Sequence, residues 1–343
     1  MPEGDGVVSA RPTVKIDGQE RPEMEQAVLA ATIDMSTDLP DWLELKLNDW
    51  GNVPGRGTGF AFTDLNLGTQ IEVFIGRGRD RAAFKGSVVG IEKQFGPRAP
   101  EIVLRAFDKL YALQRKRRSK AWEKMSVADI VRQIASDSGL RAECDIDMQG
   151  TFFQHNESDL DFLRRLAGKF ATGPRLDGDK LVVKREDVAG DPILLKIDGN
   201  LRRLSVRVST VRQPGKARVS GYDLTAGEAF TKIRDRLSGV FDGETAADFV
   251  TDEELFPRPH PRSAGEAEAY ARGAFDAVAL NFLTGEAVIS GDPDCRPGRV
   301  VSVEGADARL NGEYKIISAI HRFDSTHGYE TFLKIARGWI RRQ

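Results

Sequence analysis

The chain has 343 residues, of which 40% are hydrophobic and 30% charged, and its formal net charge is -2. This length is typical of two or three domains, and a chain of this size can fold without disulfides or a structural metal. The near-zero net charge gives no global attraction to nucleic acid or to anionic membranes. Cys144 and Cys295 belong to no CxxC or Cys/His spacing, so we expect two reduced thiols.

The sequence carries no signal for secretion or membrane insertion. Residues 1–6 contain no basic segment followed by an apolar run, and no window approaches about 18 consecutive apolar residues. We therefore expect a protein that is made in the cytoplasm and has no membrane span. Any export would come from an assembly that it joins.

Residues 12–107 predict an all-β unit, either a sandwich or a barrel. Apolar and polar residues alternate in short runs, most clearly in residues 42–47, where three leucines share one face. Residues 51–60 are rich in glycine, but they lack the Gly-Lys-Ser/Thr ending of a phosphate-binding loop. We expect them to form a mobile surface loop.

The pattern changes after residue 112. A strongly basic run at residues 115–120 is followed by two helices with the same start signal. Ser126 and Ser158 can each cap free N–H groups, and an aspartate lies three residues after each of them. A hairpin then turns at an Asp-Gly pair. We predict a small α+β domain over residues 112–190.

The second half of the chain begins with strands. Residues 191–222 have strand patterns that could complete the first β-unit, so we assign residues 1–111 plus 191–222 to that unit. A polar, proline-stiffened connector leads to a long helix that Ser263 caps. Residues 223–343 therefore comprise the connector, the long helix and a second β-unit.

The longest predicted strand of the second β-unit lies within residues 313–323. Alternation in this strand places Tyr314, Ile316 and Ile320 on one face, and Ile317, Ala319 and Phe323 on the other.

No catalytic constellation is evident in the sequence. His321 lies beside Phe323 with no Ser or Cys nucleophile at a recognisable spacing, which is typical of a packed, hydrogen-bonded histidine. Asp292 and Asp294 lie in a proline-rich turn, where Asx-type hydrogen bonding accounts for them better than a Ca²⁺ site. We predict no catalytic, cofactor or metal residue.

Several motifs, in this order, resemble the VgrG and phage late control D family. Residues 152–167 contain a glutamine and an acidic-Ser-Asp sequence before a Phe/Leu-rich helix. The basic run at residues 115–120 lies where that family has a basic strand. Residues 295–300 and 328–332 resemble its closing barrel, and the resemblance spans roughly residues 12–337.

The resemblance implies a β-rich α+β chain with two tail-tube-like β-barrel domains, an inserted α+β domain and a long helix before the second barrel. It implies the baseplate hub of a contractile phage tail or injection system, a homotrimer that joins the hexameric tail tube to the trimeric spike. The sequence has no room for the repetitive spike of VgrG, so we expect the late control D form, with the spike on a separate polypeptide. The candidate interface residues are Arg115, Lys116, Arg117, Arg118, Lys120, His321, Arg322 and Tyr329.

The expected partners are further copies of the chain, the tail tube protein, the spike protein and other baseplate proteins, with cargo as an option. We expect no cofactor and no enzymatic activity, and localisation to the cytoplasm during assembly and then to the tail particle. Two other functions stay open. A tail-associated cell-wall hydrolase would need paired carboxylates or a metal in a cleft. A nucleic-acid-binding or cargo-binding tail component would depend on residues 115–120, whose alternative interpretation is a solvated strand or an intersubunit salt-bridge surface.

Overall fold

The structure is a computed structural model of the chain. The residues described are 11–37, 39–53, 57–76, 83–184, 190–224, 226–239, 241–250, 253–257 and 260–342.

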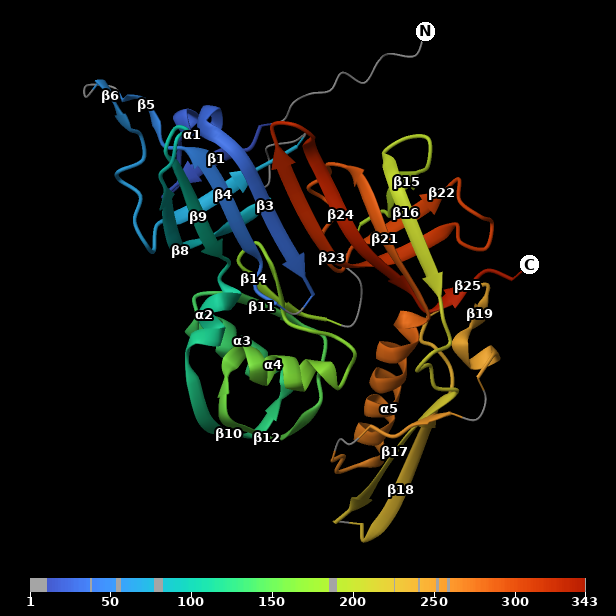
Figure 1. Cartoon of the computed structure of the whole chain (residues 1–343). Helices are drawn as coiled ribbons and strands as arrows, with labels where there is room; N and C mark the ends of the chain where they lie inside the picture. The colour runs from blue at the N-terminus through green and yellow to red at the C-terminus, as the bar shows by residue number, and fades with distance from the viewer. Residues whose placement is uncertain are drawn as a thin grey trace.

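The first part of the chain is β-rich, as predicted, and forms a first β-unit (Figure 1). A short helix, α1, lies between β2 and β3. The elements are β1 (Thr13–Ile16), β2 (Gln19–Glu20), α1 (Pro22–Ala27), β3 (Val28–Ser36), β4 (Trp42–Asn48), β5 (Trp50–Val53), β6 (Gly57–Phe60), β7 (Gln70–Phe74), β8 (Phe84–Gln94) and β9 (Glu101–Phe107).

The α+β domain follows. Both predicted serine caps are confirmed, because the hydroxyl oxygens of Ser126 and Ser158 accept hydrogen bonds from the N–H groups of Asp129 and Asp161 at 3.0 and 3.1 Å. Its elements are α2 (Leu110–Arg115), β10 (Arg117–Ser126), α3 (Val127–Asp137), β11 (Arg141–Cys144), β12 (Gln149–Ser158), α4 (Asp159–Gly168), β13 (Arg175–Asp177) and β14 (Lys180–Val183).

The remaining elements include the long helix α5 and the strands of a second β-unit. They are β15 (Ile193–Lys196), β16 (Leu201–Val208), β17 (Lys216–Asp223), β18 (Glu228–Arg234), β19 (Glu244–Thr245), η1 (Ala246–Asp248), β20 (Glu254–Leu255), α5 (Ala264–Ala279), η2 (Leu280–Phe282), β21 (Leu283–Ser290), β22 (Val300–Glu304), β23 (Gly312–Asp324), β24 (Gly328–Arg337) and β25 (Trp339–Ile340).

The main sheet repeats one strand arrangement twice. In the first unit the spatial order is β3-β4-β9-β8-β7, and in the second it is β16-β21-β24-β23-β22. The strands of both units are connected along the chain in the same way, and every neighbouring pair within a unit is antiparallel. The pairings among the described strands form an open sheet and do not close either unit into a barrel.

Two irregularities of the sheet are also repeated. The first strand of each unit has a register shift near its start, and the long fourth strand of each unit has one near its middle. The shifts lie between Val28 and Ala30 in β3, between Leu201 and Arg203 in β16, between Val88 and Gly90 in β8, and between Ile316 and Ser318 in β23.

The assignment of residues 191–222 to the first β-unit is wrong. β15 pairs with β22 and β16 pairs with β21, so both strands belong to the second unit. β17 pairs with β18 and β20 in a small separate sheet. Alternation identifies the two faces of a strand but not its neighbours, which is why the sequence pattern did not distinguish the two units.

The long helix α5 serves two cores. Ala267, Tyr270 and Ala271 in its first half pack with the α+β domain, together with Val219 of β17. Phe275, in its second half, packs in a small separate cluster. The helix therefore connects the α+β domain to the strand β21 that follows it, which the sequence pattern did not indicate.

The register shift in β23 changes which side chains reach the core. Tyr314 and Ile316 are buried on one face, as their alternation predicts. After the shift, Ala319 and His321 turn inward and Ile320 does not, contrary to the prediction that Tyr314, Ile316 and Ile320 share a face. One extra residue in a strand reverses the facing of everything that follows it.

Residues 51–60, which we expected to form a mobile loop, contain strands β5 and β6 of a hairpin. Trp50 and Phe60 lie directly across from one another, with ring centroids 5.3 Å apart in an edge-on arrangement. Phe95 extends this exposed aromatic cluster, at 6.0 Å from Phe60. Aromatic cross-strand packing therefore orders this glycine-rich segment where it is described.

Candidate assembly surface

The two β-units are joined edge to edge by β3 and β23, which lie side by side in Figure 1. The pairing is antiparallel and runs from Ala30 opposite Asp324 to Ser36 opposite Ser318. Main-chain hydrogen bonds therefore continue from one unit into the next without a break. We call this pairing the internal seam.

His321 lies in the internal seam and is 1% exposed. Its Nδ1 is 2.9 Å from the hydroxyl of Tyr329 and 3.1 Å from that of Thr331. Burial, and then the nearby Arg296 guanidinium, lower the pKa of His321 to about 3, so the imidazole is neutral at physiological pH. The structure thus places His321 between the two units of one chain, as a packed, hydrogen-bonded side chain.

Tyr329 and Arg322 lie next to this histidine on β24 and β23. Tyr329 packs so closely on the chain at Gly291 that a Cβ at that glycine would lie 2.1 Å from the tyrosine ring. Arg322 is exposed, and its guanidinium lies over the ring of Phe332 at 5.1 Å. Of the three predicted interface residues in this region, Arg322 is the one that faces solvent.

A small cavity of about 180 Å³ lies where both β-units and the α+β domain meet. Asp41 and Arg296 line it, and the carboxylate of Asp108 lies nearby, where it accepts a hydrogen bond from the N–H of Leu110 at 3.0 Å. Burial raises the pKa of Asp108 to about 7. Burial, and then the charge of Asp108, raise the pKa of Asp41 well above its usual range. The junction therefore holds a proton on this acid pair near neutral pH.

Part of the predicted basic run is engaged within the α+β domain. Arg118 Nε donates to the Asp159 carboxylate at 2.7 Å, and its guanidinium lies 3.8 Å from Asp137. The ammonium of Lys120 lies 3.7 Å from the ring centroid of Trp122. Arg118 therefore links β10 to helices α3 and α4, and Lys120 packs on a ring of its own strand.

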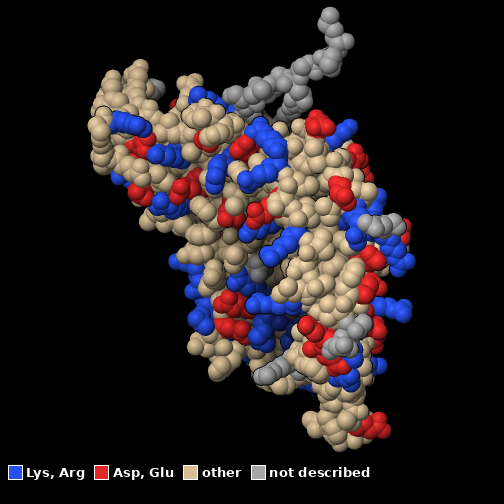
Figure 2. All heavy atoms as spheres, turned by 45° about the vertical axis from the view of Figure 1, so that its right-hand side comes forward, with Lys and Arg blue, Asp and Glu red and all other residues tan. Residues whose placement is uncertain are grey.

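The other residues of the run differ in exposure and in their contacts. Arg117 Nε donates to the carbonyl of Asn156 at 2.8 Å, across the same ribbon. Arg115 and Lys116, at the end of α2, have exposed side chains. Over the face shown in Figure 2, basic and acidic side chains are intermixed. That view shows no extended basic surface of the kind that binds nucleic acid.

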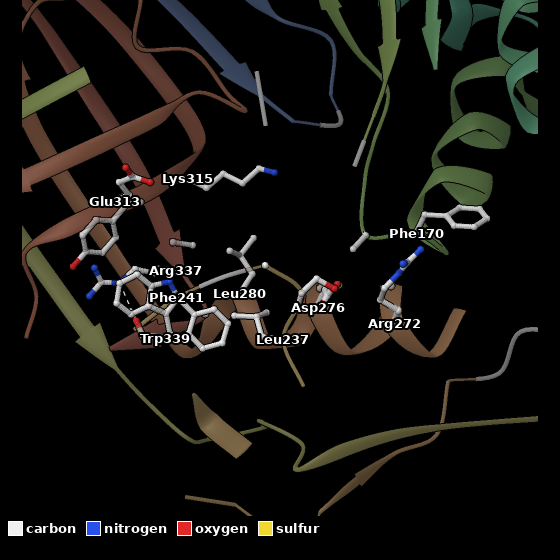
Figure 3. A pocket seen from close by; sticks show the side chains of 18 of the residues that line it. Phe170, Leu237, Phe241, Arg272, Asp276, Leu280, Glu313, Lys315, Arg337 and Trp339 are labelled. Atoms are coloured by element: carbon white, nitrogen blue, oxygen red, sulfur yellow. Dashed lines mark hydrogen bonds between the residues drawn. The ribbon is translucent and has the colours of Figure 1, made fainter. Parts of the chain in front are cut away.

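A cleft of about 730 Å³ lies between α5, the end of the α+β domain and strands β23 and β24. Figure 3 shows Phe170 and Arg272 at one end and Arg337 at the other. The Arg337 guanidinium lies 4.5 Å from the ring of Tyr314 and 4.3 Å from that of Trp339. Its three hydrogen bonds to residues that the structure describes all go to main-chain carbonyls. Arg337 therefore stabilises the cleft wall.

Cys295 and Asp292, two residues considered in the sequence analysis, lie in structural settings. The thiol of Cys295 is buried, and that burial raises its pKa, so it is not a thiolate at neutral pH. Asp292 accepts a hydrogen bond from the N–H of Asp294 at 2.9 Å, which confirms the predicted Asx-type turn. Within the described ranges, no group of three or more His, Cys, Asp and Glu side chains is arranged to hold a metal ion. None of the described helices is both long and apolar enough to cross a bilayer.

The described part of the main sheet has free strand edges, and two of them lie on β16 and on the second half of β8. β16 pairs with β21 on one side and with no described strand on the other. β8 pairs with β7 only up to Ser87, so residues 90–94 pair with β9 alone. Exposed apolar side chains accompany both edges: Val208 is 43% exposed and Phe95 is 68% exposed. Unpaired main-chain groups beside apolar side chains are characteristic of a surface that receives another strand.

The sequence profile of the family described as the Alg8 N-terminal domain matches residues 9–324. The chain belongs to this family. No curated protein matches the sequence of this Alg8 N-terminal domain family member.

Solved structures share the fold of this Alg8 N-terminal domain family member. The 43 kDa tail protein of prophage MuSo2 from Shewanella oneidensis has a TM-score of 0.71 at 15% identity, over 96% of this chain and 98% of the other. A tail protein from Neisseria meningitidis MC58 has a TM-score of 0.70 at 14% identity, over 95% and 96% of the two chains. The E. coli c3393 protein, a component of the type VI secretion system, has a TM-score of 0.57 at 14% identity, over 96% and 79%. At these identities the likeness concerns the fold, which is that of phage tail and type VI secretion proteins.

The residues at the free edges of β16 and β8 were not among the predicted interface residues. β16 contains arginines among aliphatic residues, a pattern of an exposed edge strand, but it was assigned to the first β-unit. The end of β8 was predicted only as part of the all-β unit of residues 12–107, with no role in an interface. The predicted residues lie instead in two separate regions. Residues 115–120 span the end of α2 and the start of β10, and His321, Arg322 and Tyr329 lie in or next to the internal seam.

Proposed function

We propose that this chain is the subunit of a trimeric baseplate hub that joins a hexameric tail tube to a trimeric spike. The observation that carries the proposal is the repeated strand arrangement, with the same connectivity and the same two register shifts in both β-units. Three copies of a chain with two similar units present six similar units to a six-fold partner. The same ring keeps three equivalent positions for a three-fold partner.

The proposed domain organisation follows the cores. The first tail-tube-like unit comprises residues 13–107, and the second comprises residues 193–208 and 283–340. The α+β domain, residues 110–184, shares its core with β17 and α5 from the segment between β16 and β21. Each unit would complete its barrel in the assembled ring.

The hub would act by binding and not by catalysis. Its partners would be the tail tube protein, the spike and other baseplate proteins of a phage tail or injection system, after assembly in the cytoplasm. The fold shared with tail and type VI secretion proteins supports this role. The engagement of Arg118 and Lys120 within the α+β domain favours a structural role for the basic run.

Mass photometry of the purified chain over a range of concentrations tests the proposal, and we expect particles of three subunits. A chain that stays monomeric at every concentration and in the assembled particle would contradict it. Two assays address the other functions. Clearing of cell walls in a turbidity assay would indicate a hydrolase, and DNA binding that weakens steeply with salt would indicate a nucleic-acid-binding component.

A further inference from the structure

We propose that β16 of one copy pairs with residues 90–96 of the next copy, at the free edge of β8, in the same register as the internal seam. This inference rests on the proposed ring, and it names the strands and the residue pairs that would close it. In the internal seam, the first strand of one unit meets the second half of the long fourth strand of the other. β16 and β8 are the corresponding strands that have no such partner among the described residues.

The repeated register shifts relate the two seams residue by residue. Ala30 of β3 and Arg203 of β16 each end the first shift of their unit, so they occupy equivalent positions. Ser318 of β23 and Gly90 of β8 each end the second shift, so they are also equivalent. Counting along the strands from these four residues transfers the internal register to the free edges.

This transfer specifies the facing residues. The internal pair of Asp34 and Ile320 corresponds to Arg207 of one copy and Glu92 of the next. The further internal pairs of Met35 with Ala319 and Ala31 with Phe323 correspond to Val208 with Ile91 and Leu204 with Phe95.

The charges at the two edges are complementary in this register. Glu92 and Glu44 both contact Arg105 at 2.9 Å, which leaves two carboxylates with one guanidinium. Arg207 has an exposed side chain and would face Glu92, bringing a second cation to this cluster. Opposite charges on directly opposed residues stabilise antiparallel pairs.

The apolar side chains support the same register. Phe323 in the internal seam is 4% exposed and packs in the core of the first unit, opposite Ala31 of β3. Phe95, one residue beyond the end of β8, occupies the equivalent position and is 68% exposed in the single chain. Leu204 of an incoming β16 would face Phe95, as Ala31 faces Phe323. Burial of exposed aromatic side chains is a large stabilising contribution at protein interfaces.

The charges at these positions also disfavour the pairing of β3 with the free edge of β8. β3 carries Asp34 where β16 carries Arg207, so a β3 strand bound at the edge of β8 would place Asp34 opposite Glu92. Two like charges directly opposite one another destabilise a strand pair. The charge at this position therefore selects β16 as the strand that joins neighbouring copies.

Disulfide trapping tests the register directly in the full-length chain. We expect Val208→Cys combined with Ile91→Cys to form crosslinks between copies under mild oxidation, because opposed residues in a sheet have Cα atoms about 4.5–5.5 Å apart. A non-reducing gel should then show species of up to three chains. The matched control is Val208→Cys combined with Val89→Cys, which is displaced by two residues and should crosslink weakly.

Charge exchange provides an independent test. Arg207→Glu and Glu92→Arg should each weaken trimer formation by about tenfold or more, and the double variant should recover most of the affinity. All of these positions lie on the surface, so circular dichroism should show folded variants.

The outcomes separate this inference from the proposed function. Trimers that crosslink no better through Ile91 than through Val89, and that tolerate both single charge reversals, would overturn the register and leave the hub function standing. A chain that forms no trimer, alone or in the assembled particle, would overturn both.

Discussion

Replacement of Gly273 by alanine tests how α5 is held against the α+β domain. A Cβ at this position would lie 2.3 Å from the carbonyl oxygen of Lys169 and 2.8 Å from the Cα of Phe170. Both are main-chain atoms at the end of α4, so a side-chain rotation cannot relieve the overlap. Gly265 on the same helix offers a matched control, since the nearest atom to its added Cβ is 3.9 Å away.

The expected magnitude follows from two opposing contributions. Alanine in place of glycine stabilises a helix by roughly 1 kcal/mol, and this applies most simply to Gly265→Ala. Overpacking of a close contact costs about 1–3 kcal/mol, and more where the main chain must move. We therefore expect Gly273→Ala to lower the free energy of unfolding by about 1–2 kcal/mol and to be about 2–3 kcal/mol less stable than Gly265→Ala.

Urea unfolding followed by tryptophan fluorescence measures both variants, and amide hydrogen exchange locates the effect. We expect faster exchange at the end of α4 and in the first half of α5 in Gly273→Ala only. If Gly273→Ala were as stable as Gly265→Ala, the close contact between α5 and α4 would be refuted. The role of α5 as the connection between the α+β domain and β21 would fail with it.

Three further predictions concern single side chains. Burial raises the pKa of Asp108 to about 7, so the folded chain retains a proton that this carboxyl loses in the unfolded chain above the ordinary pKa of aspartate. The free energy of unfolding therefore falls as the pH rises toward 7. Asp108→Asn should reduce that fall by on the order of 2 kcal/mol in urea titrations at pH 5 and pH 8, and an unchanged pH dependence would contradict this. Tyr329→Phe should cost only about 0.5–1.5 kcal/mol, because Thr331 remains as a partner of His321, and a loss above about 3 kcal/mol in thermal unfolding would show that Thr331 does not compensate. Ser126→Ala should cost about 1 kcal/mol by removing the cap of α3, measured against the wild type in urea, and no loss would argue against the capping hydrogen bond.

Local patterns predicted most of the secondary structure. The alternation in residues 42–47 places Leu43, Leu45 and Leu47 on one face, and all three are fully buried. The serine caps were also predictable, because a cap depends on residues three positions apart in the chain. Such features need no knowledge of which segments meet in space.

The arrangement of strands was predicted less well. Residues 201–208 alternate equally well for either β-unit, and their pairing with β21 is decided by the strand partners available in the folded chain. The register shift in β23 was not visible either, although it decides that His321 is buried and Ile320 is not. A single extra residue within a run such as Ile316-Ile317-Ser318 leaves no local signature.

The amino-acid sequence by itself determined many of the helices and strands, the serine caps and the two β-rich regions around a helical one. Only the tertiary structure decided that the two β-units repeat one arrangement, that β3 and β23 join them and that β16 and β8 remain free. The physical reason is that main-chain hydrogen bonding is the same for every strand. Side-chain packing and charge across each edge therefore choose the partner, and these contacts exist only once the chain has folded.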